Sequence, residues 1–113
     1  MSESTTKREF LFVKSEYKLI KINLSDVLYL AGLRDYTRIF LKGRTTPLTT
    51  LQNLKEFETK LHEDDFIRVH RSYIVSVKQI DTITKSEITI GIHRIPIGHA
   101  FKPSLDEVIE KNS

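Results

Sequence analysis

The sequence contains no cysteine and no tryptophan, and only four glycines and three prolines among its 113 residues. Without cysteine the chain forms neither disulfide bonds nor thiolate metal ligands, and a reducing, cytoplasmic setting is expected. The few glycines disfavour a glycine-rich phosphate-binding loop. No apolar run approaches the roughly 20 residues of a membrane helix, and the N-terminal MSESTTKREF lacks the apolar region of a secretory signal. These absences exclude several classes of protein and predict no membrane partner.

The residues that are present describe one folded domain. Hydrophobic residues make up 39% and charged residues 29% of the chain, a balance typical of soluble globular proteins. A chain of this length is expected to form a single core. Residues 1–9 are polar and aperiodic, which predicts a flexible tail or linker. We therefore expect one domain over residues 10–111.

The net charge of +3 is distributed unevenly along the chain. Residues 10–50 contain seven Lys or Arg against three Asp or Glu, and residues 66–102 contain six against two. Residues 51–65 contain two against five, and residues 103–113 contain one against three. This concentration of positive charge favours a polyanionic partner. A basic surface that is merely solvated is the alternative interpretation.

Most of the chain from Phe10 onward predicts short strands, because β-branched and aromatic residues are frequent and turn signals recur. Within 35–41 the side chains alternate, so Thr37, Ile39 and Leu41 are expected on one face. Strand patterns resume from Phe66. The strands delimited by these patterns are 10–14, 17–22, 27–33, 35–41, 80–84, 87–92 and 94–97.

Residues 80–92 predict a β-hairpin. A turn at Lys85–Ser86 separates its two strands, and Ile88, Ile90 and Ile92 alternate along the second. Pro96, in the strand that follows, is typical of a sheet edge or a chain bend.

Two segments have helical patterns. Leu51, Leu54, Phe57 and Leu61 recur at helical spacing, which predicts an amphipathic helix over 51–61. Thr49 followed by Gln52 fits a capping box at its start. Near the C-terminus, a short helix is expected with Leu105, Val108 and Ile109 on its apolar side. The chain is therefore predicted to be mainly β, with stacked small antiparallel sheets or a sandwich, one internal helix and a terminal helix.

Signals for catalysis or metal binding are weak. The four histidines have no metal-binding spacing: His62, His70, His93 and His99. Neighbouring carboxylates lie in polar stretches, where they are expected to flank helices instead of acting as acid and base. Ser72 lacks the sequence context of a nucleophile elbow. We expect no enzyme activity, no catalytic residues, no cofactor and no metal site.

Two polar clusters are candidates for binding. One is the segment 32–38, in which arginines and hydroxyl side chains follow a glycine. The other is 68–73, where Arg68 and His70 fall on the same side of an expected strand. Each has a structural alternative: a solvated β-turn for the first, and for the second a buried polar network in which Arg68 pairs with Asp64 or Asp65.

Longer motifs resemble the LytTR family of DNA-binding domains. The most specific is Phe66–Ser76, FIRVHRSYIVS, which departs from the family pattern only in its final Ser76, usually Asn. Asp26–Leu30 (DVLYL) matches a family strand motif, and the leucine-rich helix pattern falls on 51–57. The segment 96–102, PIGHAFK, resembles the family's turn into a C-terminal helix. Together the resemblance covers Phe10 to about Ile109.

The resemblance implies an elongated stack of small antiparallel sheets that binds promoter DNA through loops. Family members place these loops in successive major grooves, and copies usually sit side by side on direct repeats. They are typically output domains of two-component response regulators, so a receiver domain in a longer parent chain is an expected partner. The expected function is sequence-specific binding of double-stranded DNA in transcriptional regulation. A β-rich protein-interaction domain that does not bind DNA is the alternative.

By the same resemblance, three segments are expected to contact DNA: the turn 34–37, then 71–72, and third 99–102. Arg71 is expected to read a base, since its planar fork can pair with guanine. Tyr36, Ser72 and Lys102 are expected on phosphates, and His70 is expected to hold the loop that presents Arg71. The full set of expected DNA-binding residues is Arg34, Tyr36, Thr37, Arg71, Ser72, His99 and Lys102.

The third segment departs most from the family pattern. Gly98 replaces the usual Ser, His99 the usual Arg, and Ala100 a residue that is often basic. Fewer donors and less charge predict a weaker dependence on that groove, or a different base preference there.

Overall fold

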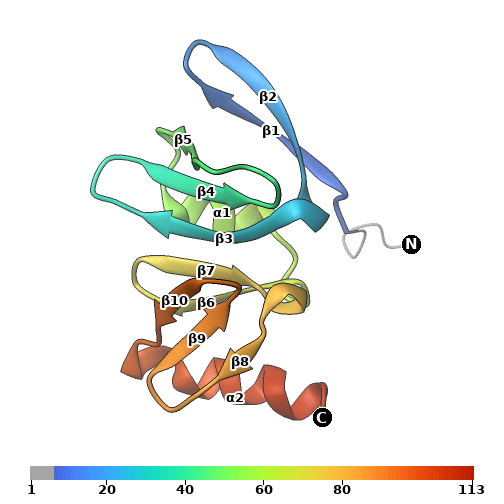
Figure 1. The fold of residues 1–113 in the computed structure, drawn as a ribbon, viewed down its shortest axis with the longest axis vertical. Coiled ribbons are helices and arrows are strands. Elements are labelled where there is room, and N and C mark those ends of the chain that lie inside the picture. Colours follow the sequence, from blue (N-terminus) through green and yellow to red (C-terminus); the bar gives the residue numbers. More distant parts are fainter. Residues whose placement is uncertain (1–6) are drawn as a thin grey trace.

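The computed structural model describes residues 7–113, which form three antiparallel sheets stacked along the longest axis of the molecule (Figure 1). The extents of the molecule are 40 × 38 × 25 Å. Stacked small antiparallel sheets with one internal and one C-terminal helix are confirmed. The tail predicted for 1–9 falls mainly on residues 1–6, which lie outside the described residues.

The first sheet is a two-stranded hairpin, the second has five strands in the order β5-β4-β3-β7-β6, and the third has three in the order β10-β9-β8. The strands are β1 Phe10–Ser15, β2 Lys18–Asn23, β3 Val27–Gly32, β4 Thr37–Leu41, β5 Leu48–Thr50, β6 Phe66–His70, β7 Tyr73–Ser76, β8 Thr82–Ile83, β9 Glu87–Ile90 and β10 His93–Pro96. The helices are α1 Leu54–Lys60 and α2 Lys102–Lys111, with 3₁₀ turns η2 Leu24–Asp26, η3 Val77–Gln79 and η4 His99–Phe101. Over residues 7–113, neither helix is long and apolar enough to span a membrane.

The five-stranded sheet is buried on both faces. In β7, Ile74 points into a cluster shared with the β1–β2 hairpin and α1, whereas Val75 points into a cluster shared with the third sheet and α2. In β6, Phe66 and Ile67 divide in the same way. Two apolar clusters therefore replace the single core that the length of the chain suggested, because the sheet needs cover on each side.

Strand β3 is central because it pairs with two strands that are distant from each other in the chain. It forms a hairpin with β4, and its other edge pairs with β7 in the register Leu30↔Ile74. The alternation predicted for β4 is confirmed, since Thr37, Ile39 and Leu41 are all buried. The pairing of β3 with β7 brings the β3–β4 turn beside the β6–β7 turn.

Helix α1 begins later than its leucine spacing predicts. Its N-cap is Asn53, whose side chain accepts from the Glu56 amide at 2.9 Å, while the Glu56 carboxylate accepts from the Asn53 amide at 3.0 Å. The Thr49–Gln52 capping box is wrong because Thr49 belongs to β5. Leu51 is accordingly 82% exposed and lies outside the helix. Asparagine is a strong N-cap, and the reciprocal bonds satisfy two orphan amides.

Other boundaries shift for reasons of turn geometry. Strands β9 and β10 are joined by the tight turn Gly91–Ile92, and Gly91 adopts φ +59°. Ile92 therefore lies exposed in the turn and does not continue the alternation of Ile88 and Ile90. In α2, Leu105 is buried in the second cluster and Val108 packs against that cluster, but Ile109 is exposed.

Tyr29 of β3 lies at the centre of the second cluster. Its ring stacks on Phe40 with centroids 4.4 Å apart, and its hydroxyl lies 3.1 Å from His93 Nδ1. Burial, with a smaller contribution from Tyr73, raises the pKa of Tyr29 to about 12.

A folded-state pKa above the ordinary value of about 10 means that folding favours the protonated phenol. The contribution of Tyr29 to stability is therefore complete below about pH 10 and is lost as pH rises through about 12. We expect ultraviolet titration of phenolate to contain a late step that disappears in Tyr29→Phe. The control Tyr17→Phe, at a fully exposed turn, should retain it. A late step that persists in Tyr29→Phe would contradict this assignment.

Candidate nucleic-acid interface

The three segments expected to bind DNA lie together along one edge of the molecule. The β3–β4 turn, the β6–β7 turn and the N-terminal end of α2 follow one another down the left edge in Figure 1. Backbone hydrogen bonds connect them: the Gly32 amide donates to the Ser72 carbonyl at 2.7 Å, and the Gly98 amide donates to the Val69 carbonyl at 2.7 Å. The spatial relation of the segments is therefore set by main-chain groups.

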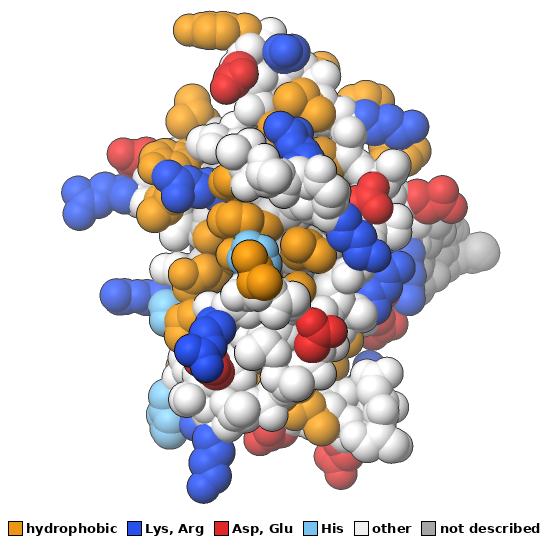
Figure 2. Space-filling view, viewed as in Figure 1, with side chains coloured by type: hydrophobic (Ala, Val, Ile, Leu, Met, Phe, Trp, Pro, Cys, Tyr) orange, Lys and Arg blue, Asp and Glu red, His pale blue; other side chains and the backbone are white. Residues whose placement is uncertain are grey.

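This edge presents cations to solvent. Basic side chains and histidines lie along it in Figure 2. Arg34, Arg71 and His99 are exposed, and Lys102 is half-buried at the start of α2. Within residues 7–113 none of these four forms an ion pair. Cations without carboxylate partners are available to an anionic ligand.

The three hydroxyl residues expected to contact DNA differ in exposure: two are half-buried in the turns, and Thr37 is fully buried. Tyr36 and Ser72 are half-buried, and the guanidinium of Arg38 lies 5.8 Å from the ring centroid of Tyr36. Thr37 is fully buried, and its hydroxyl donates to the Gln52 carbonyl at 2.7 Å. Its side chain thus ties β4 to the segment before α1 and does not face the edge.

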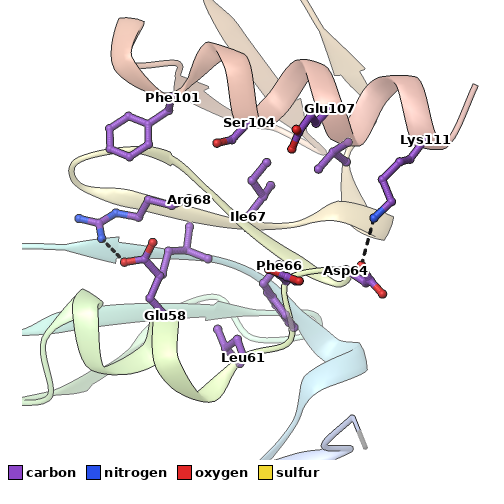
Figure 3. Close-up of a pocket in the computed structure, with 13 residues that line it drawn as sticks. Glu58, Leu61, Asp64, Phe66, Ile67, Arg68, Phe101, Ser104, Glu107 and Lys111 are labelled. Atoms are coloured by element: carbon purple, nitrogen blue, oxygen red, sulfur yellow. Dashed lines mark hydrogen bonds and ion pairs between the residues drawn. The ribbon is translucent and has the colours of Figure 1, made fainter. Parts of the chain in front are cut away.

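Behind the β6–β7 turn, a cleft of about 460 Å³ separates α1 from α2 (Figure 3). Its floor is apolar and includes Phe66 and Ile67 of β6. Arg68 and Glu58 lie toward one end, and Lys111 pairs with Asp64 at 3.4 Å toward the other. At the first end of the cleft, the guanidinium of Arg68 lies close to α1 and pairs with Glu58.

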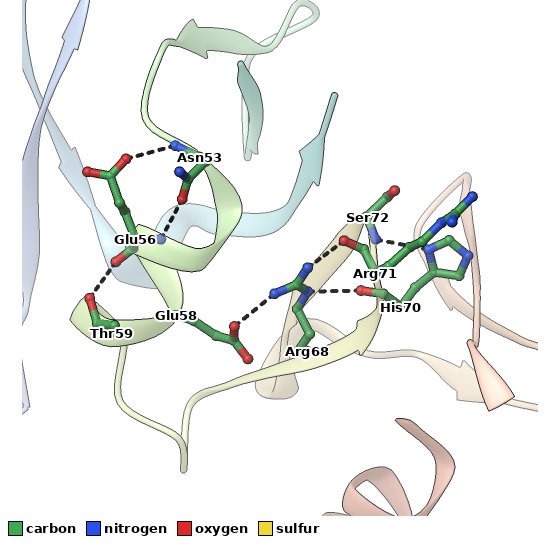
Figure 4. Close-up of polar contacts among 8 residues, drawn as sticks. All are labelled: Asn53, Glu56, Glu58, Thr59, Arg68, His70, Arg71 and Ser72. Atoms are coloured by element: carbon green, nitrogen blue, oxygen red, sulfur yellow. Dashed lines mark hydrogen bonds and ion pairs between the residues drawn. The ribbon is translucent and has the colours of Figure 1, made fainter. Parts of the chain in front are cut away.

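Arg68 connects helix α1 to the turn that carries Arg71 (Figure 4). Its Nη1 donates to Glu58 Oε1 at 2.8 Å, its Nε donates to the His70 carbonyl at 3.0 Å, and its Nη2 donates to the Arg71 carbonyl. Three separate nitrogens of the planar guanidinium donate to these acceptors, whereas a lysine has a single nitrogen. The predicted polar network is present, but the predicted partners Asp64 and Asp65 are wrong. They pair with Lys111 and Lys7 instead.

His70 closes the same turn from the other side. Its Nδ1 accepts a hydrogen bond from the Ser72 amide at 3.0 Å, so this nitrogen carries no proton when the bond is made. Its ring also lies 5.4 Å from that of Tyr73. These contacts fit the expectation that His70 holds the loop that presents Arg71.

Gly98 allows the third segment to approach the β6–β7 turn closely. A Cβ at this position would lie 3.0 Å from Phe101 Cδ2 and 3.4 Å from His70 Cα. Phe101 in turn lies under the Arg68 guanidinium, 5.9 Å from its ring centroid. Gly98, which replaces the family's usual serine, therefore lies where Phe101 and His70 leave little room for a side chain.

Glu58 and Phe101 take part in this arrangement but were not expected from the sequence. Glu58 lies in the acidic segment 51–65, where several carboxylates look equivalent. Only its position on α1, facing β6, distinguishes it from its neighbours. No local pattern in the sequence indicates such a contact.

Comparisons with known proteins agree with this geometry. A family model described as the LytTr DNA-binding domain matches residues 17–110. A solved structure described as the LytTr DNA-binding domain of a response regulator from Bacillus cereus matches with a TM-score of 0.76 and 27% sequence identity. The match covers 90% of this chain and 97% of that chain. No curated protein matches the sequence.

We expect Arg68→Lys to loosen the β6–β7 turn without unfolding the domain. A lysine can keep the ion pair with Glu58 but leaves carbonyls of the turn without their donors, which costs about 1–3 kcal/mol. Amide hydrogen exchange should speed up at Ser72 and Gly32, whose bonds belong to the turn. Glu58→Gln keeps an acceptor for Arg68 and serves as the milder control. Unchanged exchange in Arg68→Lys would show that the guanidinium does not hold the turn.

Proposed function

The chain belongs to the LytTR family of DNA-binding domains, and we propose that it binds promoter DNA in a sequence-specific manner along the edge described above. The observation that supports this best is the exposed Arg71, presented by a turn that Arg68 and His70 hold from two sides. In this proposal the domain acts in transcriptional regulation as the output domain of a two-component response regulator. The receiver domain belongs to a longer parent chain, and the site of action is the cytoplasm.

The proposed interface has three parts, and its loops enter successive major grooves. Arg71 reads a base, with guanine the preferred partner because its O6 and N7 match the guanidinium fork. Tyr36, Ser72 and Lys102 contact phosphates, which set the register on the duplex. Arg34 and His99 border these contacts in the first and third segments. Thr37 is left out because its side chain is buried.

Because Arg68 already orders the β6–β7 turn in the free protein, Arg71 can bind DNA more tightly than it could from a flexible loop. A loop that must become ordered on binding loses conformational entropy, and that loss reduces affinity. Here the carbonyl groups of His70 and Arg71 are already bound by Arg68 in the free protein. Only the exposed side chain of Arg71 then remains to be ordered by DNA.

The third segment contributes less than the second. His99 carries a full positive charge only when protonated, whereas an arginine always does. Lys102 is the remaining cation of this segment, at the first residue of α2. We therefore propose that this segment supplies non-specific attraction through Lys102. The proposal includes no catalytic step, cofactor or metal.

Arg71→Ala is expected to weaken binding to the preferred site by about 1–3 kcal/mol and to relax specificity at one base position. Selection from a random duplex pool, followed by fluorescence anisotropy on the selected site, measures both effects. Arg44→Ala is the matched control, because the β4–β5 connection that contains Arg44 turns on the opposite side from the edge (Figure 1). If Arg71→Ala binds like the control, the β6–β7 turn does not read DNA. Peptide binding that tolerates salt would then favour the protein-interaction alternative.

Lys102→Ala is expected to weaken binding to all sequences alike. Removing one phosphate contact should reduce the slope of log affinity against log salt by about one. Anisotropy titrations of the random pool at several salt concentrations measure this slope. A change in base preference without a change in slope would place Lys102 on a base instead of a phosphate.

A further inference from the structure

The outer face of the β1–β2 hairpin exposes a group of large apolar side chains. Because strands alternate, Leu11 and Val13 point inward and are buried. Phe12 and Leu19 point outward and are 58% and 68% exposed. Phe10 is also exposed, and its ring meets that of Phe12 edge to face at 5.7 Å. Clustered apolar exposure of this kind is typical of an interaction surface.

The same face is positively charged. Lys14 is paired across the hairpin with Leu19, and Lys21 with Phe12, so both lysines share the outer face with the apolar group. Lys21 Nζ lies 4.4 Å from the ring centroid of Phe10. Residues 10–23 contain three lysines and one glutamate. A matching partner surface should therefore combine acidic and apolar groups.

Helix α2, at the opposite end of the molecule, has such a surface. Asp106 and Glu110 are exposed on it, together with Pro103 and Ile109, whereas Glu107 lines the cleft toward α1. Residues 103–113 contain three carboxylates and one lysine. Among the described residues, neither these three carboxylates nor the lysines of the hairpin face form an ion pair. Each end thus carries charge that has no partner within residues 7–113.

The two ends are placed so that neighbouring copies on DNA would bring them together. The hairpin lies at the top and α2 at the bottom of the longest axis, and the proposed DNA-binding edge runs between them (Figure 1). Copies whose edges follow one duplex in the same orientation would therefore meet end to end. Such a contact joins two different surfaces, a head-to-tail arrangement that suits repeated sites in one direction.

We propose that the outer face of the β1–β2 hairpin docks on α2 of a second copy of this chain bound to the adjacent DNA site. This inference rests on the proposed DNA binding. Each face is only a few side chains wide, so the contact is weak between free molecules. DNA raises the effective concentration of the second copy and makes the contact significant. The expected result is cooperative binding to tandem sites.

Charge reversal tests this pairing. The hairpin variant is Lys14→Glu with Lys21→Glu, and the helix variant is Asp106→Lys with Glu110→Lys. Binding is measured on duplexes with one selected site and with two sites in the same direction, whose spacing is varied. The wild type should gain about tenfold in affinity for the second site, within the usual range of coupling energies, at spacings that place both copies on one side of the helix. Each variant should lose this gain, measured against its own single-site affinity.

The combined variant, with all four substitutions, is the decisive control. It keeps the wild-type net charge and restores opposite charges across the contact, so cooperativity should return. All four positions are exposed, and thermal unfolding checks that each variant remains folded. Leu19→Ser removes apolar area without a change of charge and should reduce the gain. If the wild type binds single sites but shows no gain at any spacing, the docking is wrong and the proposed DNA binding stands.

A measurement without DNA separates the two proposals. At high protein concentration, amide chemical shifts should move with concentration only in β1–β2 and α2, and should stop moving in the hairpin variant. Such shifts in a protein that binds no DNA would support the contact and overturn the proposed function. Their absence, together with non-cooperative DNA binding, would overturn the contact alone.

Discussion

The hydrogen bonds of Arg68 organise the edge of the molecule that we propose binds DNA. One guanidinium reaches a carboxylate on α1, two carbonyls of the β6–β7 turn and the ring of Phe101 before α2. These groups come from three segments that have no covalent reason to be close together. Because Arg68 is half-buried and every donor it uses has an acceptor, removing it leaves acceptors without donors in a partly dry environment. The neighbouring residues play different roles. Arg71 faces solvent, whereas His70 stabilises the turn through the Ser72 amide.

This arrangement needs a rigid support, which the five-stranded sheet provides. Cover on both faces keeps β6 and β7 from sliding, since a slip of one residue would exchange Ile74 and Val75 between the two clusters. The turn between these strands is therefore held at its base by apolar packing and at its tip by polar bonds. Pairing of β3 with β7 extends the same support to the β3–β4 turn.

Local patterns predict a large part of this fold. The alternation of Thr37, Ile39 and Leu41 identifies β4 and its buried face, and the motif around Arg68 indicates the family. The start of α1 is predicted too early, because Leu51 fits the helical spacing while the strand β5 occupies the residues before it. The β3–β7 pairing and the choice of Glu58 for Arg68 depend on contacts between distant segments. Neither leaves a periodic signal in the sequence.

The attachment of the edge segments through main-chain groups has an evolutionary consequence. The bonds from Gly32 to Ser72 and from Gly98 to Val69 use amides and carbonyls, which nearly every residue type supplies. Side chains at positions such as 34, 71 and 99 can therefore be exchanged with little effect on the scaffold. Under the proposed function, a substitution at the exposed position 71 would then change the preferred DNA sequence without a change in the scaffold. In such an arrangement, the residues proposed to meet DNA and the residues that form the buried sheet can vary independently of each other.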